Sequence, residues 1–313
     1  MIDARAVLSR LQENIGQAFL SKGEAVELLL VALLSGGHAL IEDVPGVGKT
    51  TLASALARSV SCSFSRIQFT PDITPSDITG FSMPGPDGCF LYRPGPILSQ
   101  IVLADEINRT SPKTQAALLE AMEERQVTVD GVTHPAPQPF LVLATQNPAD
   151  FVGTYPLPEA QTDRFLLRIR LGYPSPSDEA AILERYCSPE RPLSLVEPIC
   201  PAENILSLAN QAAEVYLSPD VRRYIVALAG ATRENPGLTL GASTRAAVAL
   251  GRAAQGLALL RGRDYVLPED VQRLLLPVWA HRLVLSPEGR MQGLSAEEIL
   301  SLLLSSVSVG RGR

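Results

Sequence analysis

Residues 44–51 have the residue types and spacing of a phosphate-binding loop, and they read Val44, Pro45, Gly46, Val47, Gly48, Lys49, Thr50 and Thr51. Glycines in such a loop let backbone N–H groups come close to phosphate oxygens. The lysine can reach the β- and γ-phosphates of a nucleotide, and the hydroxyl of Thr50 can coordinate Mg²⁺. Only three lysines occur in the chain, so a lysine at this position is less easily a coincidence. The segment therefore predicts a site for ATP and Mg²⁺.

One position departs from the usual phosphate-loop pattern. Asp43 stands five residues before Gly48, where the pattern has a glycine. The alternative interpretation is a glycine-rich turn between a strand and a helix that binds no nucleotide. The context favours the nucleotide, because the segment follows an apolar strand and opens a helical stretch over residues 51–60.

Two acidic residues follow a second apolar stretch, residues 101–104. Asp105 would hold Mg²⁺ and Glu106 would polarise the attacking water, which is the division of labour that phosphoryl transfer needs. A strand that runs into a solvated acidic turn would give the same local sequence.

Asn147 follows another apolar strand and could position the water near the γ-phosphate. An asparagine before a proline is also a common turn residue. The order of the three motifs favours one shared site, because the carboxyl ends of parallel strands meet at the same edge of a sheet.

These motifs need a sheet that brings several strand ends together. Short β-rich stretches alternate with helical patterns from residue 38 to about 170, and the strand candidates are residues 38–41, 64–69, 100–104 and 140–144. Continuous apolar runs of this kind are typical of parallel strands buried on both faces. The predicted fold class is therefore α/β, a P-loop NTPase with a doubly wound parallel sheet.

Two β-hairpins are predicted as projections from this sheet. Residues 70–96 are rich in proline and glycine, with Gly85-Pro86-Asp87-Gly88 between possible strands. Residues 126–139 contain Asp130-Gly131, which supplies the positive φ that a two-residue turn needs.

Strand signals stop near residue 173. Ser218-Pro219 predicts the start of a helix over residues 221–231, and Ser295 to Glu298 form a capping box before the apolar run 299–304. We therefore predict two domains: an α/β nucleotide-binding domain, residues 1–173, and an all-helical lid domain, residues 174–313.

Composition narrows the classes of partner and location. A net charge of -6 and a pI near 5.3 give no general attraction to phosphate backbones, so a nucleic-acid role would need a local basic patch. No stretch of about 18 uncharged apolar residues and no signal-peptide pattern occurs, and the four cysteines lack metal-ligand spacing. We expect a cytoplasmic protein without a transmembrane segment.

Four motifs together resemble those of the MoxR family of AAA+ ATPases, in the helix-2-insert clade. They are Glu42-Asp43-Val44-Pro45-Gly46-Val47-Gly48-Lys49-Thr50, Ala104-Asp105-Glu106-Ile107-Asn108-Arg109, Ala144-Thr145-Gln146-Asn147-Pro148 and Gly153-Thr154-Tyr155-Pro156-Leu157-Pro158-Glu159-Ala160-Gln161-Thr162-Asp163-Arg164-Phe165. The resemblance covers nearly the whole chain, and Asp43 is compatible with that family's phosphate loop. Ser21 stands where the family has a glycine near the adenine, which leaves the adenine contacts open.

The resemblance implies roles for three arginines. Arg164 would be the arginine finger inserted into a neighbouring subunit's site, where a planar cation stabilises transition-state charge. Arg245 resembles sensor 2, which reports the γ-phosphate to the helical lid, and Arg109 would face the subunit interface. The alternatives are a surface ion pair for Arg164 and an ordinary first-turn arginine for Arg245.

The resemblance also implies an assembly and a partner. It suggests a homo-oligomeric ring, expected to be a hexamer, that hydrolyses ATP at subunit interfaces and acts as a chaperone-like remodeller or activator of a von Willebrand factor A domain protein. The hairpins would be the helix-2 insert, residues 74–93, and the pre-sensor-1 hairpin, residues 126–139. Two alternatives remain, a nucleic-acid motor of the same clade and a nucleotide-gated binding switch.

Overall fold

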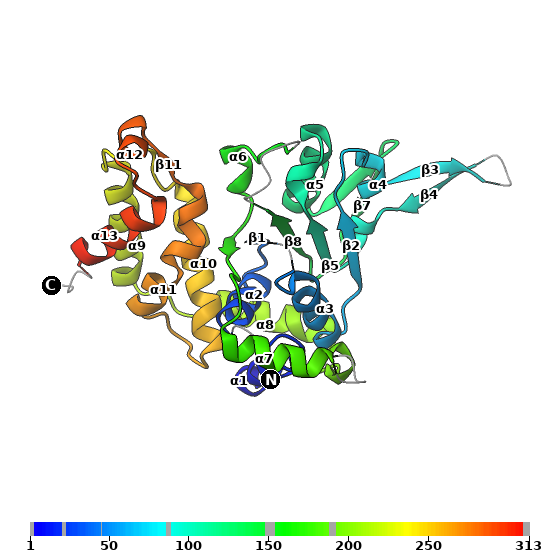
Figure 1. Ribbon diagram of the computed structural model, residues 1–313, viewed down its shortest axis with the longest axis horizontal. Coiled ribbons are helices and arrows are strands. Elements are labelled where there is room, and N and C mark those ends of the chain that lie inside the picture. Colours follow the sequence, from blue (N-terminus) through cyan, green and yellow to red (C-terminus); the bar gives the residue numbers. More distant parts are fainter. Residues whose placement is uncertain are drawn as a thin grey trace.

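The computed structural model describes residues 3–20, 23–44, 46–85, 89–147, 154–187 and 192–308. An α/β part built on a five-stranded sheet lies beside a helical part, as Figure 1 shows. The helices of the α/β part are α1 (Ala4–Ala18), α2 (Gly23–Leu34), α3 (Lys49–Ser59), α4 (Pro75–Thr79), α5 (Pro112–Glu124) and α6 (Glu159–Thr162).

All neighbouring strands of the sheet run parallel, in the order β2-β5-β8-β1-β9. Their bounds are β1 (Ala39–Glu42), β2 (Phe64–Gln68), β5 (Ile101–Asp105), β8 (Leu141–Gln146) and β9 (Leu167–Ile169). The four predicted strands are confirmed within two residues. β9 was not predicted, because three residues with Arg168 in the middle carry too little pattern. This order places the carboxyl ends of β5, β8 and β1 side by side.

Successive residues of the central strands point to opposite faces of the sheet. Leu103 and Leu141 belong to the buried cluster on the face of α1, α2 and α3, whereas Val102 and Val142 belong to a second cluster on the face of α4 and α5. A strand buried on both faces needs apolar residues at every position, which explains the runs without alternation. The predicted fold class is confirmed.

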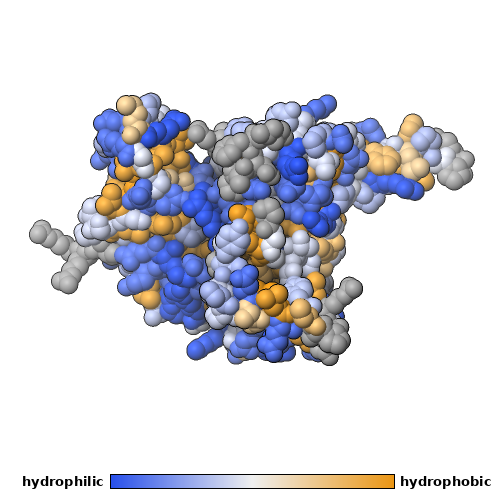
Figure 2. Space-filling model, in the orientation of Figure 1, coloured by the Kyte–Doolittle hydropathy of each residue, from blue (hydrophilic) through white to orange (hydrophobic). Residues whose placement is uncertain are grey.

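Both predicted hairpins are present. They pair β3 (Gly80–Pro84) with β4 (Phe90–Pro94) and β6 (Gln126–Val129) with β7 (Val132–Pro135). Asp130 and Gly131 both have positive φ, as the turn type requires. The β3–β4 hairpin projects far from the body (Figure 1) and carries a hydrophobic, orange region in Figure 2. Phe90 and Leu91 of this hairpin are exposed. Its expected turn at residues 86–88 lies outside the described residues.

The helical part contains one small sheet that the sequence did not predict. Its helices are α7 (Pro176–Tyr186), α8 (Ala202–Glu214), α9 (Pro219–Arg233), α10 (Thr244–Leu260), α11 (Pro268–Trp279), α12 (Pro287–Met291) and α13 (Ala296–Ser306), with a short 3₁₀ helix η4 (Ala280–Arg282). The predicted caps at Ser218 and Ser295 are confirmed. The expectation of an all-helical domain was wrong in one detail, because β10 (Leu238–Leu240) pairs antiparallel with β11 (Val284–Leu285). Strands of two or three residues are too short to give a periodic signal.

The helical part shares a core with the α/β part. α10 packs on α1 and α2, and one cluster of buried apolar side chains includes residues of all three helices. None of the helices in the described part of the chain is long and apolar enough to cross a membrane. The predicted domain boundary at residues 173 and 174 stays a prediction.

Candidate nucleotide-binding site

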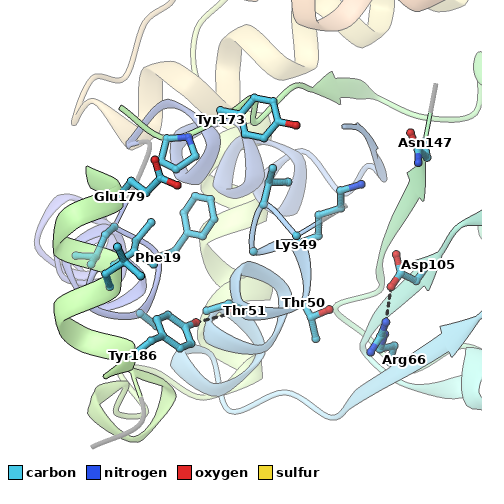
Figure 3. A pocket seen from close by; sticks show the side chains of 18 of the residues that line it. Phe19, Lys49, Thr50, Thr51, Arg66, Asp105, Asn147, Tyr173, Glu179 and Tyr186 are labelled. Carbon is cyan, nitrogen blue, oxygen red and sulfur yellow. Dashed lines mark hydrogen bonds and ion pairs between the residues drawn. The ribbon is translucent and has the colours of Figure 1, made fainter. Parts of the chain in front are cut away.

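A pocket of about 730 Å³ opens at the carboxyl edge of the sheet, between the start of α3 and the helix α7. Figure 3 shows Lys49, Thr50, Asp105 and Asn147 toward one end and Phe19, Tyr173, Glu179 and Tyr186 toward the other. The pocket is large enough for a nucleotide, and its polar residues gather at one end while its aromatic residues gather at the other. The three sequence motifs therefore meet at one site.

The loop before α3 has the backbone geometry that phosphate binding needs. Gly46 and Gly48 both have φ +87°, which favours glycine, and a Cβ on Gly48 would lie 3.2 Å from the ring of Phe19. Lys49 begins α3, and its ammonium donates a hydrogen bond to the carbonyl of Asp43 at 2.7 Å. Burial lowers the pKa of Lys49, although the carboxylates of Asp43, Asp105 and Glu106 act in the opposite direction. Pro45 lies outside the described residues, whereas Val44, Val47, Thr50 and Thr51 lie within them.

Asp43, the residue that departs from the usual loop pattern, ties the loop to the chain that leads to α7. Its carboxylate accepts hydrogen bonds from the backbone N–H groups of Val44 and Gly172, at 2.8 and 2.5 Å. A glycine at this position could not make either bond. The aspartate therefore fixes the loop relative to residue 172, close to the predicted domain boundary.

Thr145, a buried residue of β8, positions the two acidic residues after β5. Its hydroxyl donates to Asp105 Oδ1 at 2.6 Å and accepts from the backbone N–H of Glu106 at 2.9 Å. Glu106 has φ +59°, a left-handed conformation that is uncommon outside glycine and is typical of functional turns. Sequence reasoning gave Thr145 no role, although a hydroxyl before Gln146 and Asn147 was a possible signal.

Residues of β2 also contact both acids, and sequence reasoning missed them. The Arg66 guanidinium lies 2.6 Å from Asp105 Oδ2, and the Gln68 amide donates to Glu106 Oε2 at 2.9 Å. The Arg109 guanidinium also lies 3.1 Å from Glu106 Oε2. The expectation that Arg109 faces a subunit interface stays a prediction. Asn147 lines the pocket at the end of β8 and is buried.

The residues present fit a divalent cation bound beside phosphates. Asp105 faces the pocket and already holds a cation, the Arg66 guanidinium, which stands in for the charge of a metal ion at this carboxylate. The Thr50 hydroxyl lines the same pocket. Mg²⁺ prefers hard oxygen ligands and commonly takes one or two carboxylates together with substrate phosphates.

The apolar end of the pocket suits the flat ring of a nucleobase. Phe19 after α1, Tyr173, and Leu183 and Tyr186 of α7 line it, and the Tyr186 hydroxyl lies 3.3 Å from Thr51 Oγ1. None of the residues of α7 is buried, so this helix covers the pocket without a core of its own. Ser21, at which the adenine contacts were left open, lies outside the described residues.

Arg164 and Arg245 are not among the described residues that line this pocket. They lie together on another face, where Glu123 of α5 binds Arg164 Nε at 2.8 Å and an Arg245 NH group at 2.9 Å. Arg245 also lies 3.7 Å from Asp163. We call these four residues the arginine cluster. The expectation that Arg245 reports the γ-phosphate stays a prediction, and in this chain its guanidinium contacts Glu123 of α5.

Comparisons with known proteins identify the family of this chain. The family described as "ATPase family associated with various cellular activities (AAA)" matches residues 38–167, and the "AAA lid domain" matches residues 230–302. Chaperone MoxR1 of Mycobacterium tuberculosis is 42% identical over 96% of this chain and 82% of its own length, and the protein YeaC of Bacillus subtilis is 48% identical over 98% and 96%. The crystal structure of a putative ATPase from Cytophaga hutchinsonii covers 98% of this chain and 96% of its own, with a TM-score of 0.92 and 37% identity.

Proposed function

The chain belongs to the MoxR family of AAA ATPases, and from this membership we propose that it hydrolyses ATP at the interfaces of a homo-oligomeric ring, with Mg²⁺, to remodel or activate a partner protein. Binding and hydrolysis of ATP follow from the family. The ring, the metal ion and the partner are the proposed steps. A hexamer is the expected size of the ring.

The separation of the arginine cluster from the pocket is the observation that carries the interface proposal. Lys49 and both acids lie in the pocket, whereas Arg164 and Arg245 lie on another face of the same chain. Stabilising transition-state charge requires an arginine to reach the transferring phosphoryl group. A second copy whose cluster faces this pocket would supply both arginines in trans.

The pocket residues divide the work of hydrolysis as follows. Lys49 binds the β- and γ-phosphates, and Thr50 and Asp105 would hold Mg²⁺, which supplies positive charge to the phosphate oxygens when bound. Glu106 accepts a proton from the attacking water while Gln68 and Arg109 fix its carboxylate. Asn147 orients the water, and Thr145 keeps both acids at the edge of the sheet.

A protein partner fits the chain better than nucleic acid. The relative MoxR1 is named a chaperone, and the net charge of -6 gives no general attraction to DNA. We infer that the partner carries a von Willebrand factor A domain. DNA that stimulates turnover at low salt, in place of such a protein, would identify a nucleic-acid motor.

Mixing inactive variants tests the shared site. Glu106→Gln and Arg164→Ala should each bind ATP without hydrolysing it. In a one-to-one mixture, one interface in four combines an intact Glu106 with a neighbour's intact Arg164, so turnover should recover to about a quarter of wild type if sites act independently.

The matched control mixes Lys49→Ala with Glu106→Gln. Both variants keep Arg164, and neither can complete a pocket, so this mixture should stay inactive. If the mixture of Glu106→Gln and Arg164→Ala shows no recovery of turnover at any ratio, the trans arrangement is refuted.

A further inference from the structure

The segment that carries Arg164 is bound at its back by η4 of the helical part. The Thr162 hydroxyl donates to the His281 carbonyl at 2.9 Å, and an Arg282 NH group donates to the Phe165 carbonyl at 2.7 Å. The second NH group of Arg282 lies 3.1 Å from Asp163 Oδ1, as an ion pair without the alignment of a hydrogen bond. These contacts fix the residues on both sides of Arg164.

Arg282 has an unusual environment for an arginine. Its side chain is only 4% exposed, and burial lowers its pKa to about 10, against the opposing effect of Asp163. The group therefore remains a cation at neutral pH. A buried cation is tolerated only while its partners stay in place, so residues 163–166 and Arg282 constrain one another.

The arginine cluster receives a second constraint from the other side. Glu123 of α5 binds both Arg164 and Arg245, and the Asp163 carboxylate lies between Arg245 and Arg282. Arg164 is thus held between the α/β part, through Glu123, and the helical part, through Arg282. A guanidinium with its five donors in a fixed plane can bind a carbonyl and a carboxylate at once, whereas an ammonium is a point charge.

We propose that Arg282 is a positioning residue for the arginine finger, through which the helical part of one subunit sets the placement of Arg164 in the next subunit's ATP site. The proposal rests on the proposed function, because it requires Arg164 to act in trans. Arg282 itself touches no substrate. Its loss should misplace the finger and leave the subunit's own pocket intact.

The test compares Arg282→Met, Arg282→Lys and the control Arg290→Met, in which an exposed arginine of α12 receives the same substitution. Misplacing a catalytic group by about an ångström costs on the order of 100-fold in rate. We expect kcat of Arg282→Met to fall by about that factor while KM for ATP stays within about twofold. Arg282→Lys should recover only part of the loss, and Arg290→Met should match wild type.

Mixing separates a misplaced finger from a damaged fold. An Arg282→Met subunit keeps Glu106, so one-to-one mixing with Glu106→Gln should restore about a quarter of wild-type turnover, the recovery also expected for Arg164→Ala. Wild-type kcat in both Arg282 variants, or recovery with Arg164→Ala but not with either Arg282 variant, would overturn the inference. If the Met variant does not fold, the Lys variant decides. Absence of recovery with Arg164→Ala would instead reject the proposed function.

Discussion

Lowering the pH from 7.5 to 5.5 should destabilise this protein through two buried histidines. Burial lowers the pKa of His38 to about 4, with Arg125 adding to the effect against the Met122 carbonyl. Burial and the Arg282 charge lower the pKa of His281 to about 3. Both rings are therefore neutral in the folded chain at pH 5.5, whereas the unfolded chain, with a histidine pKa near 6.5, binds protons there.

Burial is the main cause of the low pKa of His38, and the hydrogen bond that Nδ1 accepts acts in the same direction. Its Nδ1 accepts the Val142 backbone N–H at 3.0 Å, so Nε2 carries the proton and points to the Met122 carbonyl at 3.0 Å. A second proton on Nδ1 would face another donor and would place a charge in the core. The folded state therefore resists protonation.

The magnitude follows from the difference in pKa. A folded-state pKa below the unfolded value gives stability that is complete above about pH 6.5 and is lost as the pH falls toward the folded value. One pH unit below 6.5 costs about 1.4 kcal/mol for each histidine, hence about 2.8 kcal/mol for both at pH 5.5. The carboxyl groups with a lowered pKa, such as Glu297, titrate at lower pH and contribute little in this window.

Urea unfolding at the two pH values measures this difference. In His38→Gln the absolute stability should fall, but the loss between pH 7.5 and 5.5 should shrink to about 1.4 kcal/mol because one titrating group is gone. The measured quantity is the change in the free energy of unfolding between the two pH values, so the pH-independent cost of the substitution cancels. An equal loss in variant and wild type would refute the assignment of His38.

Three further changes have calculable outcomes. Arg66→Gln should lower the Mg²⁺ concentration for half-maximal turnover about two- to fivefold, because Asp105 is released from an ion pair worth roughly 0.5–1 kcal/mol. The pair is weak because the Arg66 side chain is 46% exposed and the Asp105 side chain 13%. An unchanged Mg²⁺ dependence would contradict this prediction. Tyr173→Ala should raise KM for ATP roughly tenfold, since stacking of a base on an aromatic ring contributes about 1–3 kcal/mol, and Tyr173→Phe should not. Asn14→Leu should lower the free energy of unfolding in urea by about 2–4 kcal/mol, because the buried Asn14 amide donates to the Ser59 hydroxyl and the Glu197 carbonyl. A loss no greater than that of Ser59→Ala would contradict this prediction.

The sequence predicted those parts of the site whose signal is local. The phosphate loop, the acids after β5 and Asn147 after β8 each follow an apolar run, and parallel pairing then brings the strand ends together. Asp130-Gly131 fixed one hairpin by its backbone requirement alone. In these cases the residues that determine the local structure lie within a few positions of one another in the sequence.

Contacts between distant segments could not be predicted in this way. Arg66 meets Asp105 because β2 pairs with β5 in a register that places Gln68 beside Asp105 across the ladder. Nothing around Arg66 in the sequence distinguishes it from other exposed arginines. The bridging of Arg164 and Arg245 by Glu123 likewise depends on how α5, α6 and α10 meet, which no local pattern reports.

A second chain of contacts joins the nucleotide end of the sheet to the helical part. Gln146, the neighbour of Asn147, donates to Glu42, the neighbour of Asp43, and Glu42 accepts from Arg168 of β9 at 2.9 Å. Arg168 also binds Glu297 of α13, and its side chain is largely buried. The end of β1 and the end of β8 therefore share one ion-pair network with α13.

The two networks together restrict how the helical part can move. One network holds it to Glu42, beside the phosphate loop, and the other holds it through Arg282 to the residues around Arg164. A rotation of the helical part that preserves both networks must displace β9 and the segment that carries Arg164 together, since Phe165 and Arg168 are three residues apart. A rotation that breaks the second network separates the buried Arg282 from Asp163, and loss of the partner of a buried charge costs several kcal/mol. A rotation that breaks the first network removes Glu297 from Arg168, which keeps its contact with Glu42. We therefore expect the two largely buried arginines, Arg168 and Arg282, to couple a subunit's own pocket to Arg164, which we propose to act in the neighbouring subunit.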